Sequence, residues 1–548
     1  MSSYQQSVHG WRQVVLIATQ LLALLFATVD TSIVSTALVT ISVSLQDFVN
    51  APWVILSYLL TYLGCAIGFS KLSDIYGRRN MLCCSWALFV AFSIGCARST
   101  TMTQLIVCRA FQGMGGAGLY SLSQIVLFEV GRKDKPSLMG GLIGITLAVS
   151  FVLGPILGSV IASTTTWSVI FWINVPAGVI AVTVLYLAFP REQTTLSRGW
   201  SSIRKIDFVG NFAVMVASAL LVFALQEAGS YTYTWDSVVI VVSLSIASLS
   251  WVVFFTWEIY LGLKRSTYIE PIMPLRLFFR RVYASCVVCT VCTGYIFLST
   301  LVVLPERFQI VNGENALWSG IHLLPMLGST SFGAFLAGAV SRKQNNSSWA
   351  MMAAQVLQLI GIAFMSTLKD ATTQTQAQYG FQVLLGLGIG LSLGAGTIVA
   401  SVQSQNEDLA VAQGALAQAR VFGGAIGIAI CGIIFNRKVA SDLEGKMDPA
   451  DLAALHHSPT IASWLPQDVQ LLVRSVYASA FTSDINVMIG VGVAGVVISA
   501  FLYEKHPPSM SQQAKEVSGI DGRSDTELVT ITTGGSRRSL MRVMSDRR

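Results

Sequence analysis

The sequence consists of long apolar runs separated by short polar loops, and this pattern limits the fold more than any other feature. A helix that crosses a bilayer needs about 20 mostly apolar residues. Charged residues make up only 11% of the chain, against roughly 25% in soluble domains. The sequence therefore predicts an all-α polytopic membrane protein. We expect fourteen spans, near residues 14–41, 52–70, 80–97, 104–128, 138–162, 167–189, 207–226, 236–257, 283–304, 318–340, 349–368, 379–402, 414–435 and 485–503.

Most lysines and arginines fall in every second loop and in the C-terminal tail. Cytoplasmic loops carry such an excess of cations, so both termini are predicted to be cytoplasmic. The net charge of +7 is explained by this topology and predicts no nucleic-acid partner. The expected organisation is a cytoplasmic N-terminus (1–13), an N-terminal six-helix bundle (14–189), a linker with two extra spans (190–282), a C-terminal six-helix bundle (283–503) with a long outside loop (436–484), and a disordered cytoplasmic tail (504–548).

Asp30 lies well inside the first predicted span and Arg109 inside the fourth, whereas Arg420 is near the inner end of the thirteenth. A charge at the centre of a membrane helix costs at least ~2.5–3.5 kcal/mol, which makes each residue a candidate for function. Burial favours the protonated form of a carboxyl, so Asp30 could load and release a proton. The alternative is a structural Asp30, permanently protonated or paired. Arg109 keeps its proton and would act as a fixed charge, with Gln112 one helical turn away.

A charged turn joins the second and third predicted spans, with Asp74, Gly77, Arg78 and Arg79 close together. Gly77 can adopt the positive φ that closes such a turn. A plain cytoplasmic loop would account for the cations. The order of residues favours a latch at an inner gate, in which Asp74 pairs locally or with a helix end of the other bundle in one transport state only.

The fifth predicted span contains Gly154, Pro155 and Gly158. Proline removes one backbone hydrogen bond from a helix, and glycine lets a neighbouring helix approach closely. This span is therefore predicted to bend and to pack tightly against a partner helix.

These stretches together resemble signatures of the major facilitator superfamily, and specifically of the fungal-type drug:proton antiporters with fourteen spans. The resemblance covers about residues 11 to 505. Four motifs carry it: Asp30-Thr31-Ser32-Ile33-Val34-x-x-Ala37-Leu38, Leu72-x-Asp74-x-x-Gly77-Arg78-Arg79, Arg109-x-x-Gln112-Gly113 and Gly154-Pro155-x-x-Gly158. The chain departs from the family patterns at Val39, Ser70, Ile75, Ser150 and Ser159.

The resemblance implies two six-helix bundles around a midplane cavity, two linking spans, and transport by rocking of one bundle against the other. It implies a monomeric proton-coupled exporter of a small apolar or amphipathic molecule, without a cofactor or a metal. Asp30, Arg109 and Gln112 would couple protons, and Gly154, Pro155 and Gly158 would form the kink typical of exporters. The plasma membrane is the expected location, with the vacuolar membrane as an alternative. Candidate polar groups of the cavity are Tyr58, Tyr62, Gln124, Asn174 and His322, although His322 could equally be a packing residue.

Other functions remain open at this stage. A proton-coupled importer or vacuolar carrier of basic amino acids or siderophores would need more acidic cavity residues than the sequence offers. A membrane-embedded enzyme would need a nucleophile–base pair or a metal cluster within the spans, and the sequence shows neither. The cysteines Cys286, Cys289 and Cys292 lie within an apolar run with no histidine nearby. We interpret them as packing residues and not as metal ligands. A receptor without transport activity is the third alternative.

Overall fold

The structure is a computed structural model of the chain. It describes residues 10–131, 136–189, 207–228, 233–263, 275–341, 344–368, 376–404, 409–444, 446 and 467–505. Outside these residues lie most of the predicted N-terminus and tail, and residues 190–206 at the start of the predicted linker.

The described residues form helices joined by turns, and no strand occurs among them. The helices are α1 (Trp11–Ser44), α2 (Ala51–Tyr76), α3 (Arg78–Ala97), α4 (Met102–Val130), α5 (Pro136–Thr164), α6 (Val169–Trp172), α7 (Asn174–Ala188), α9 (Phe208–Ala228), α10 (Val238–Leu263), α11 (Leu275–Phe278), α12 (Arg281–Ile310), α13 (Ala316–Ile321), α14 (Leu324–Val340), α15 (Ser347–Met365), α16 (Ala377–Gln403), α17 (Leu409–Leu443), α19 (Gln467–Ser499) and the 3₁₀ turn η4 (Ala500–Leu502).

The all-α membrane class is confirmed. Within the described residues, 12 helical segments are long and apolar enough to cross a membrane. The other two predicted spans correspond to α2, whose apolar part is Ala51–Ala66, and to α4, which carries Arg109, Gln112 and several glycines. The sixth and tenth predicted spans are each interrupted near one end, as α6–α7 and α13–α14.

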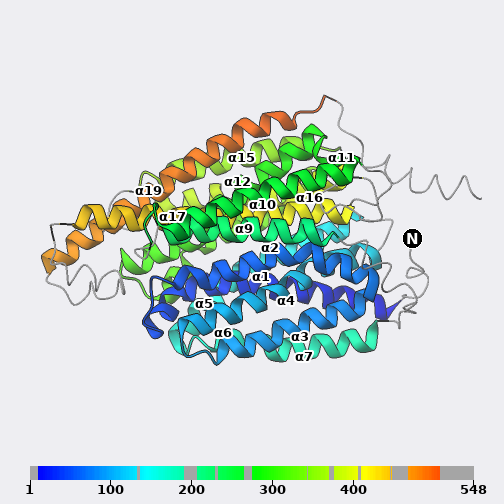
Figure 1. Ribbon diagram of the computed structural model, residues 1–548, viewed down its shortest axis with the longest axis horizontal. Coiled ribbons are helices and arrows are strands. Elements are labelled where there is room, and N and C mark those ends of the chain that lie inside the picture. Colours follow the sequence, from blue (N-terminus) through cyan, green and yellow to red (C-terminus); the bar gives the residue numbers. More distant parts are fainter. Residues whose placement is uncertain are drawn as a thin grey trace, which may run out of the picture.

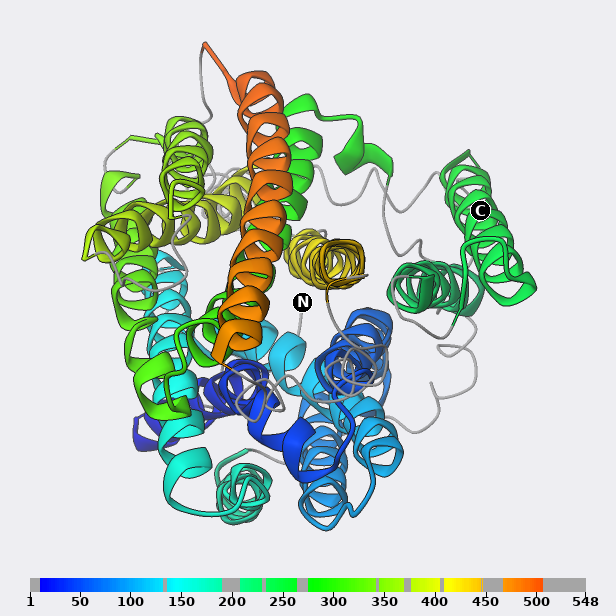
Figure 2. The same cartoon turned by 90° about the vertical axis from the view of Figure 1, so that its left-hand side faces the viewer.

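The helices form two groups that lie one above the other in Figure 1. In the N-terminal bundle (α1–α7), α4 packs against α2 and α3, and α1 packs against α5. In the C-terminal bundle (α12–α19), α16 packs against α14 and α15, and α12 packs against α17 and α19. Helices α9 and α10 pack against each other at the side of the molecule (Figure 2). The two bundles meet through α5 with α13 and α14, α1 with α12, and α2 with α17.

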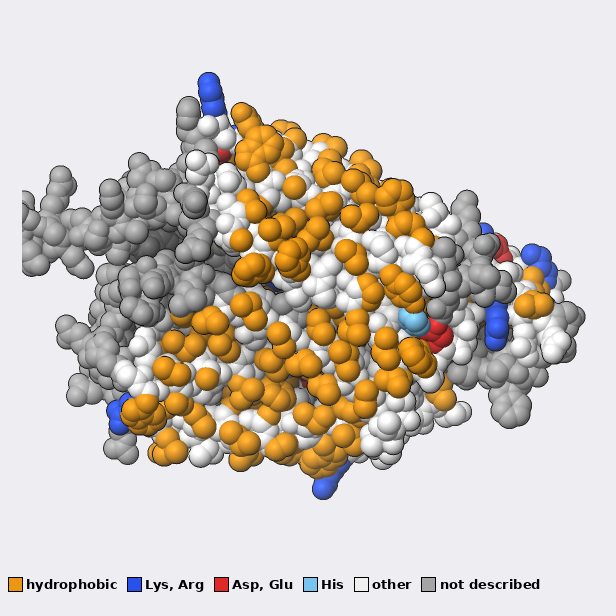
Figure 3. All heavy atoms as spheres, turned by 180° about the vertical axis from the view of Figure 1, so that it is seen from behind, with side chains coloured by type: hydrophobic (Ala, Val, Ile, Leu, Met, Phe, Trp, Pro, Cys, Tyr) orange, Lys and Arg blue, Asp and Glu red, His pale blue; other side chains and the backbone are white. Residues whose placement is uncertain are grey.

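The flank of the molecule is covered with apolar side chains, and most of the visible Lys and Arg lie toward its ends (Figure 3). Large apolar residues are also strongly exposed on other described helices, for example Leu187 on α7 at 72% and Val238 on α10 at 77%. Such exposure is unfavourable in water but matches the hydrocarbon of a bilayer. The flank is therefore the lipid-facing surface.

The last predicted span begins too late along the chain. Helix α19 begins at Gln467, and α17 continues to Leu443, so both ends of the predicted outside loop 436–484 are helical. Polar residues such as Gln470 and Arg474 in the first half of α19 hide this half from a hydropathy reading. As a result, Asp484 lies within a helix and not at the end of a loop.

Glycines of α5 bring this helix into close contact with α1. A Cβ atom added at Gly154 would overlap the Ser32 hydroxyl, and one added at Gly158 would overlap the carbonyl oxygen of Ile33. Pro155 lies between them inside the helix. The prediction of a tight helix contact at this motif agrees with this geometry.

We expect Gly158→Ala to destabilise the protein by about 1–3 kcal/mol, the usual cost of overpacking. The new methyl group would push against the backbone of α1, which cannot rotate away as a side chain can. Gly144→Ala on the same helix is the control, because its added Cβ meets nothing within 4 Å. Thermal unfolding of the purified variants measures the difference. Equal effects of the two substitutions would contradict the close approach of α1 and α5.

Candidate functional site

A buried ion pair lies at the centre of the N-terminal bundle. Arg109 of α4 donates through Nη1 to the Oδ2 atom of Asp30 on α1. Both side chains are 0% exposed. Removing one partner from such a pair leaves an uncompensated charge in a low-dielectric interior. The charges of Asp30 and Arg109 therefore compensate each other.

Two amide side chains complete the hydrogen bonding of the Asp30 carboxylate. Its Oδ1 atom accepts from Gln112 Nε2 at 2.9 Å and from Asn174 Nδ2 at 3.1 Å. The same two amide nitrogens also donate to the Ser93 hydroxyl, at 2.9 and 3.2 Å. Helices α1, α3, α4 and α7 are thus joined at one point. An ionised carboxylate with this many donors is well stabilised in its charged form.

Arg109 is held in place by further groups besides Asp30. Its Nε atom donates to the carbonyl oxygen of Val54 on α2 at 3.0 Å, and Nη1 also donates to Gln112 Oε1 at 2.9 Å. Its guanidinium carbon lies 4.3 Å from the centre of the Tyr58 ring, close enough for a cation–π interaction. The Tyr58 hydroxyl donates to the carbonyl oxygen of Ala27 at 3.2 Å. The arginine is therefore a fixed charge in a rigid surrounding.

The structure brings together the three residues predicted to couple protons, Asp30, Arg109 and Gln112. Two predicted cavity residues, Tyr58 and Asn174, also belong to this site and not to an open cavity. Ser93 was missed, because a serine in a membrane helix is common and carries no distinctive signal. The site is fully enclosed within one bundle.

Tyr62 and Gln124 lie elsewhere, closer to the junction of the bundles. The Tyr62 ring packs against Tyr58 and Tyr120, with ring centres 6.2 and 5.6 Å apart. Gln124 is partly buried one helical turn after Tyr120.

Helix α17 of the other bundle meets α2 at this level. Gln418 Nε2 donates to the carbonyl oxygen of Leu63 at 2.7 Å. The Arg420 side chain lies within electrostatic range of Tyr62, and its Nε atom is buried without a hydrogen-bond partner among the described residues. The contact between the bundles thus combines aromatic rings with one cationic side chain.

His322 forms a separate group at the end of the molecule opposite the termini. Its Nδ1 atom lies 2.5 Å from the Tyr379 hydroxyl, and its Nε2 atom lies 3.2 Å from Glu314 Oε1. Burial raises the pKa of Glu314, and the neighbouring His322 opposes this rise. The five predicted cavity residues therefore occupy three different places.

The charged turn between α2 and α3 fastens three helices of one bundle. Gly77 has φ of 89° and separates the two helices. Arg78 pairs with Glu129 at the end of α4, with Nη2 to Oε1 at 2.9 Å. Arg79 donates to the carbonyl oxygen of Tyr186 at 3.1 Å and stacks on its ring at 4.2 Å. The side chain of Asp74 lies outside the described part of the structure, so its latch role stays a prediction.

The C-terminal bundle contains an uncharged polar cluster that the sequence analysis did not identify. Gln355 and Gln358 of α15 donate to the Thr293 hydroxyl of α12 at 3.0 and 3.2 Å. Thr293 lies 2.8 Å from the Ser392 hydroxyl of α16. Glutamines are tolerated in a span when they find partners, and only the structure shows that these two converge.

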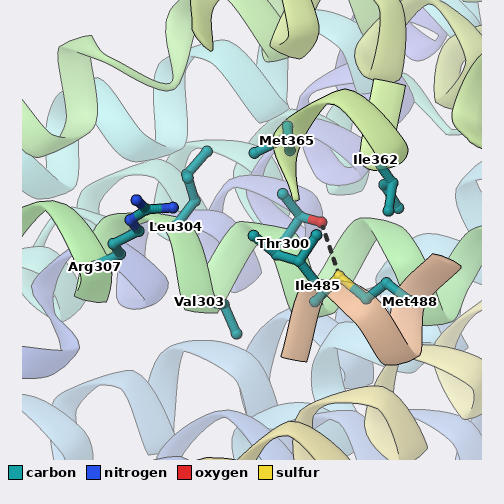
Figure 4. Close-up of a pocket in the computed structure, with 8 residues that line it drawn as sticks. All are labelled: Thr300, Val303, Leu304, Arg307, Ile362, Met365, Ile485 and Met488. Carbon is teal, nitrogen blue, oxygen red and sulfur yellow. Dashed lines mark hydrogen bonds between the residues drawn. The ribbon is translucent and has the colours of Figure 1, made fainter. Parts of the chain in front are cut away.

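A narrow apolar pocket also lies in the C-terminal bundle (Figure 4). Thr300 donates to the Met488 sulfur there at 3.6 Å. The pocket lies between α12, α15 and α19, within one bundle, and does not reach the junction of the two bundles. Its lining residues are Thr300, Val303, Leu304, Arg307, Ile362, Met365, Ile485 and Met488.

A double-mutant cycle tests the ion pair. Arg109→Met should destabilise the protein by about 3–5 kcal/mol, because it leaves the Asp30 charge buried without a cation. Asp30→Asn should cost less, because Val54, Gln112 and Tyr58 still hold the Arg109 guanidinium. The double variant should lose less than the two single variants together, because neither charge is then left alone. Unfolding of the purified proteins measures the three values; simple additivity would show that the two side chains do not interact.

The His322 group predicts a pH-dependent effect. His322→Ala should lower stability by about 1–3 kcal/mol at neutral pH, because the largely buried Glu314 loses its partner. The pKa of Glu314 in the folded protein lies above its unfolded value. Glu314 therefore takes up a proton more readily when folded, and the effect should shrink as the pH falls through this raised pKa. Adding Glu314→Gln should remove the pH dependence, and its persistence would contradict this explanation.

Comparisons with known proteins agree with this geometry. The model of the Major Facilitator Superfamily matches residues 21–428. The MFS-type transporter FPY5 of Fusarium mangiferae is 34% identical over 507 residues, which are 91% of this chain and 85% of that protein. The MFS-type efflux pump MMF1 of Pseudozyma antarctica is 28% identical over 511 residues, 91% of each chain.

Solved structures show the same fold at low sequence identity. A bacterial homolog to the human lysosomal transporter Spinster, in an inward-facing and unoccupied conformation, has a TM-score of 0.58 at 12% identity. The match covers 90% of this chain and 97% of that one. With two helical bundles, a buried Asp30–Arg109 pair and these relatives, the chain belongs to the major facilitator superfamily of membrane transporters.

Proposed function

We propose that this transporter exports a small apolar or amphipathic molecule in exchange for protons, by alternating access of a site between its two bundles. Export is supported by the relative that is named an efflux pump and by the Gly154–Pro155–Gly158 motif of α5. On this proposal both termini face the cytoplasm, and the plasma membrane is the site of action.

The observation that carries the proposal is the enclosed carboxylate of Asp30. In the described conformation Arg109 compensates its charge. A proton that binds Asp30 neutralises the carboxylate and so removes its electrostatic attraction to the Arg109 guanidinium. Arg109 does not need to move far, because Val54, Gln112 and Tyr58 still hold it. Protonation can therefore loosen α1 from α4 without leaving the arginine unsupported.

Helix α1 connects the proton site to the other bundle. Six residues after Asp30, the carbonyl oxygen of Thr36 accepts a hydrogen bond from Gln309 of α12 at 3.4 Å. On the neighbouring helix α5, Phe151 packs edge-on against Phe297 of α12, with ring centres 4.8 Å apart. Gly154 and Gly158 allow α5 to pack closely against α1. A shift of α1 would therefore disturb both contacts with α12.

The contacts between the bundles favour a state that is open toward the termini. Thr36–Gln309 and the close approach of Gly320 to Ser159 lie toward the end opposite the termini. Gln418–Leu63 lies near the middle of α2 and within the first third of α17. With cytoplasmic termini, this is an inward-open state. We place the substrate on the cytoplasmic side of these contacts, beside Tyr62, Tyr120, Gln124 and Arg420.

Asp30→Asn should abolish transport driven by a pH gradient while the protein stays folded. The amide has nearly the shape of the acid but cannot bind and release a proton. Efflux of fluorescent amphipathic compounds from proteoliposomes measures the effect, and flux should fall to that of empty vesicles. Asp442→Asn is the matched control, because Asp442 pairs with Lys438 at 2.9 Å at the far end of α17. Unchanged pH-driven flux in Asp30→Asn would refute the coupling role.

A further inference from the structure

A second buried carboxyl lies in the C-terminal bundle, far along the chain from Asp30. Asp484 is in the middle of α19 and is 1% exposed. Neither of its carboxyl oxygens has a hydrogen-bond partner among the residues that the structure describes. Buried polar atoms are normally hydrogen-bonded, so each exception needs an explanation.

Among the described residues, no positive charge compensates Asp484. Tyr295 and Glu306 on α12 and the Cys431 thiol on α17 lie within electrostatic range of Asp484. Helix α15, which also packs on α19, has no charged residue. Arg307 follows Glu306 directly in the sequence. Its side chain donates to the carbonyl oxygen of Leu368 at 2.7 Å. The charged neighbour of Asp484 is therefore a second carboxyl.

The space around Asp484 is also poor in hydrogen-bond donors. Met488, one helical turn away on the same face of α19, lines the apolar pocket of Figure 4. The Tyr295 hydroxyl is buried and makes no hydrogen bond. An ionised Asp484 would thus lose its hydration without gaining a donor or a cation. Several kcal/mol oppose such a charge, and a buried group in this situation takes up a proton instead.

We propose that Asp484 is a second proton-binding site of the transporter and that it carries a proton in the described conformation. The contrast with Asp30 supports this assignment. Asp30 has a cation and two amide donors, which favour its charged form. Asp484 has neither, and Glu306 repels a negative charge there.

Asp484 is placed where a change between the bundles can reach it. Helix α12, which bears Tyr295 and Glu306, also makes the contacts of Phe297 with Phe151 and of Gln309 with Thr36. When these contacts break, α12 can shift against α19, and water or the Tyr295 hydroxyl can then reach the carboxyl. A proton released in that state would make Asp484 part of the transport cycle. The role of Asp484 in the transport cycle rests on the proposed proton-coupled function. The presence of a bound proton on Asp484 does not depend on that proposal.

Infrared spectroscopy of the purified protein tests the bound proton directly. A protonated carboxyl has a C=O stretching band that carboxylates lack and that shifts in D₂O. Asp484→Asn should remove a band that the wild type shows at neutral pH. Asp484→Glu should keep an acid band at a shifted position, and Asp442→Asn, whose carboxylate is paired with Lys438, should change nothing. An unaltered acid band in Asp484→Asn would overturn the proposal.

Proton counting during transport tests the use of this site. In proteoliposomes, Asp484→Asn should lower the number of protons exchanged per substrate molecule by about one, whereas Asp30→Asn should abolish coupled flux. The wild-type count in Asp484→Asn would remove Asp484 from the cycle. If the wild type itself moves no protons while the acid band of Asp484 is present, the proposed coupling fails and the proton-binding site stands.

Discussion

The ion pair between Asp30 and Arg109 determines much of the surrounding structure. Two opposite charges enclosed in a membrane bundle are best tolerated when their remaining hydrogen-bonding atoms find partners, and among the described residues only Nη2 of Arg109 lacks one in this pair. Gln112 and Asn174 provide donors for the carboxylate. Glycines on α4 let α2 come close enough to cover the arginine, because a Cβ at Gly113 or Gly116 would overlap the Tyr58 backbone or hydroxyl. The small residues of α4 and the aromatic residue of α2 therefore both help to enclose the Asp30–Arg109 pair.

The two bundles stabilise their buried polar groups in different ways. The N-terminal bundle holds a compensated charge, and the Arg78–Glu129 pair fastens α3 to α4 at the end that carries the termini. The C-terminal bundle uses uncharged amides around Thr293. Between the bundles, the described hydrogen bonds from Gln309 and Gln418 end on backbone carbonyl oxygens. Single neutral hydrogen bonds contribute only about 0.5–1.5 kcal/mol each, so the junction can break while each bundle stays intact.

The sequence predicts the charged parts of the site well, because a charge in a span stands out against an apolar background. It predicts Asn174 and Tyr58 as polar groups but not their place, since the rotation of a helix about its axis is set by packing with other helices. Ser93 and Gln355 carry no signal, because single polar residues are common in spans. Asp484 was assigned to a loop because the outer half of α19 is polar, and a long helix need not be apolar beyond the bilayer.

The energies involved explain why Arg109 needs its other partners. One pH unit supplies about 1.4 kcal/mol per proton, and a membrane potential of 100 mV adds about 2.3 kcal/mol. Breaking a buried ion pair by removal of one partner costs about 3–5 kcal/mol, which ranges from most of that driving force to more than all of it. Val54, Gln112 and Tyr58 keep the guanidinium bound when Asp30 becomes neutral. The free-energy difference between the charged and protonated states can then stay small enough for a single proton to switch them.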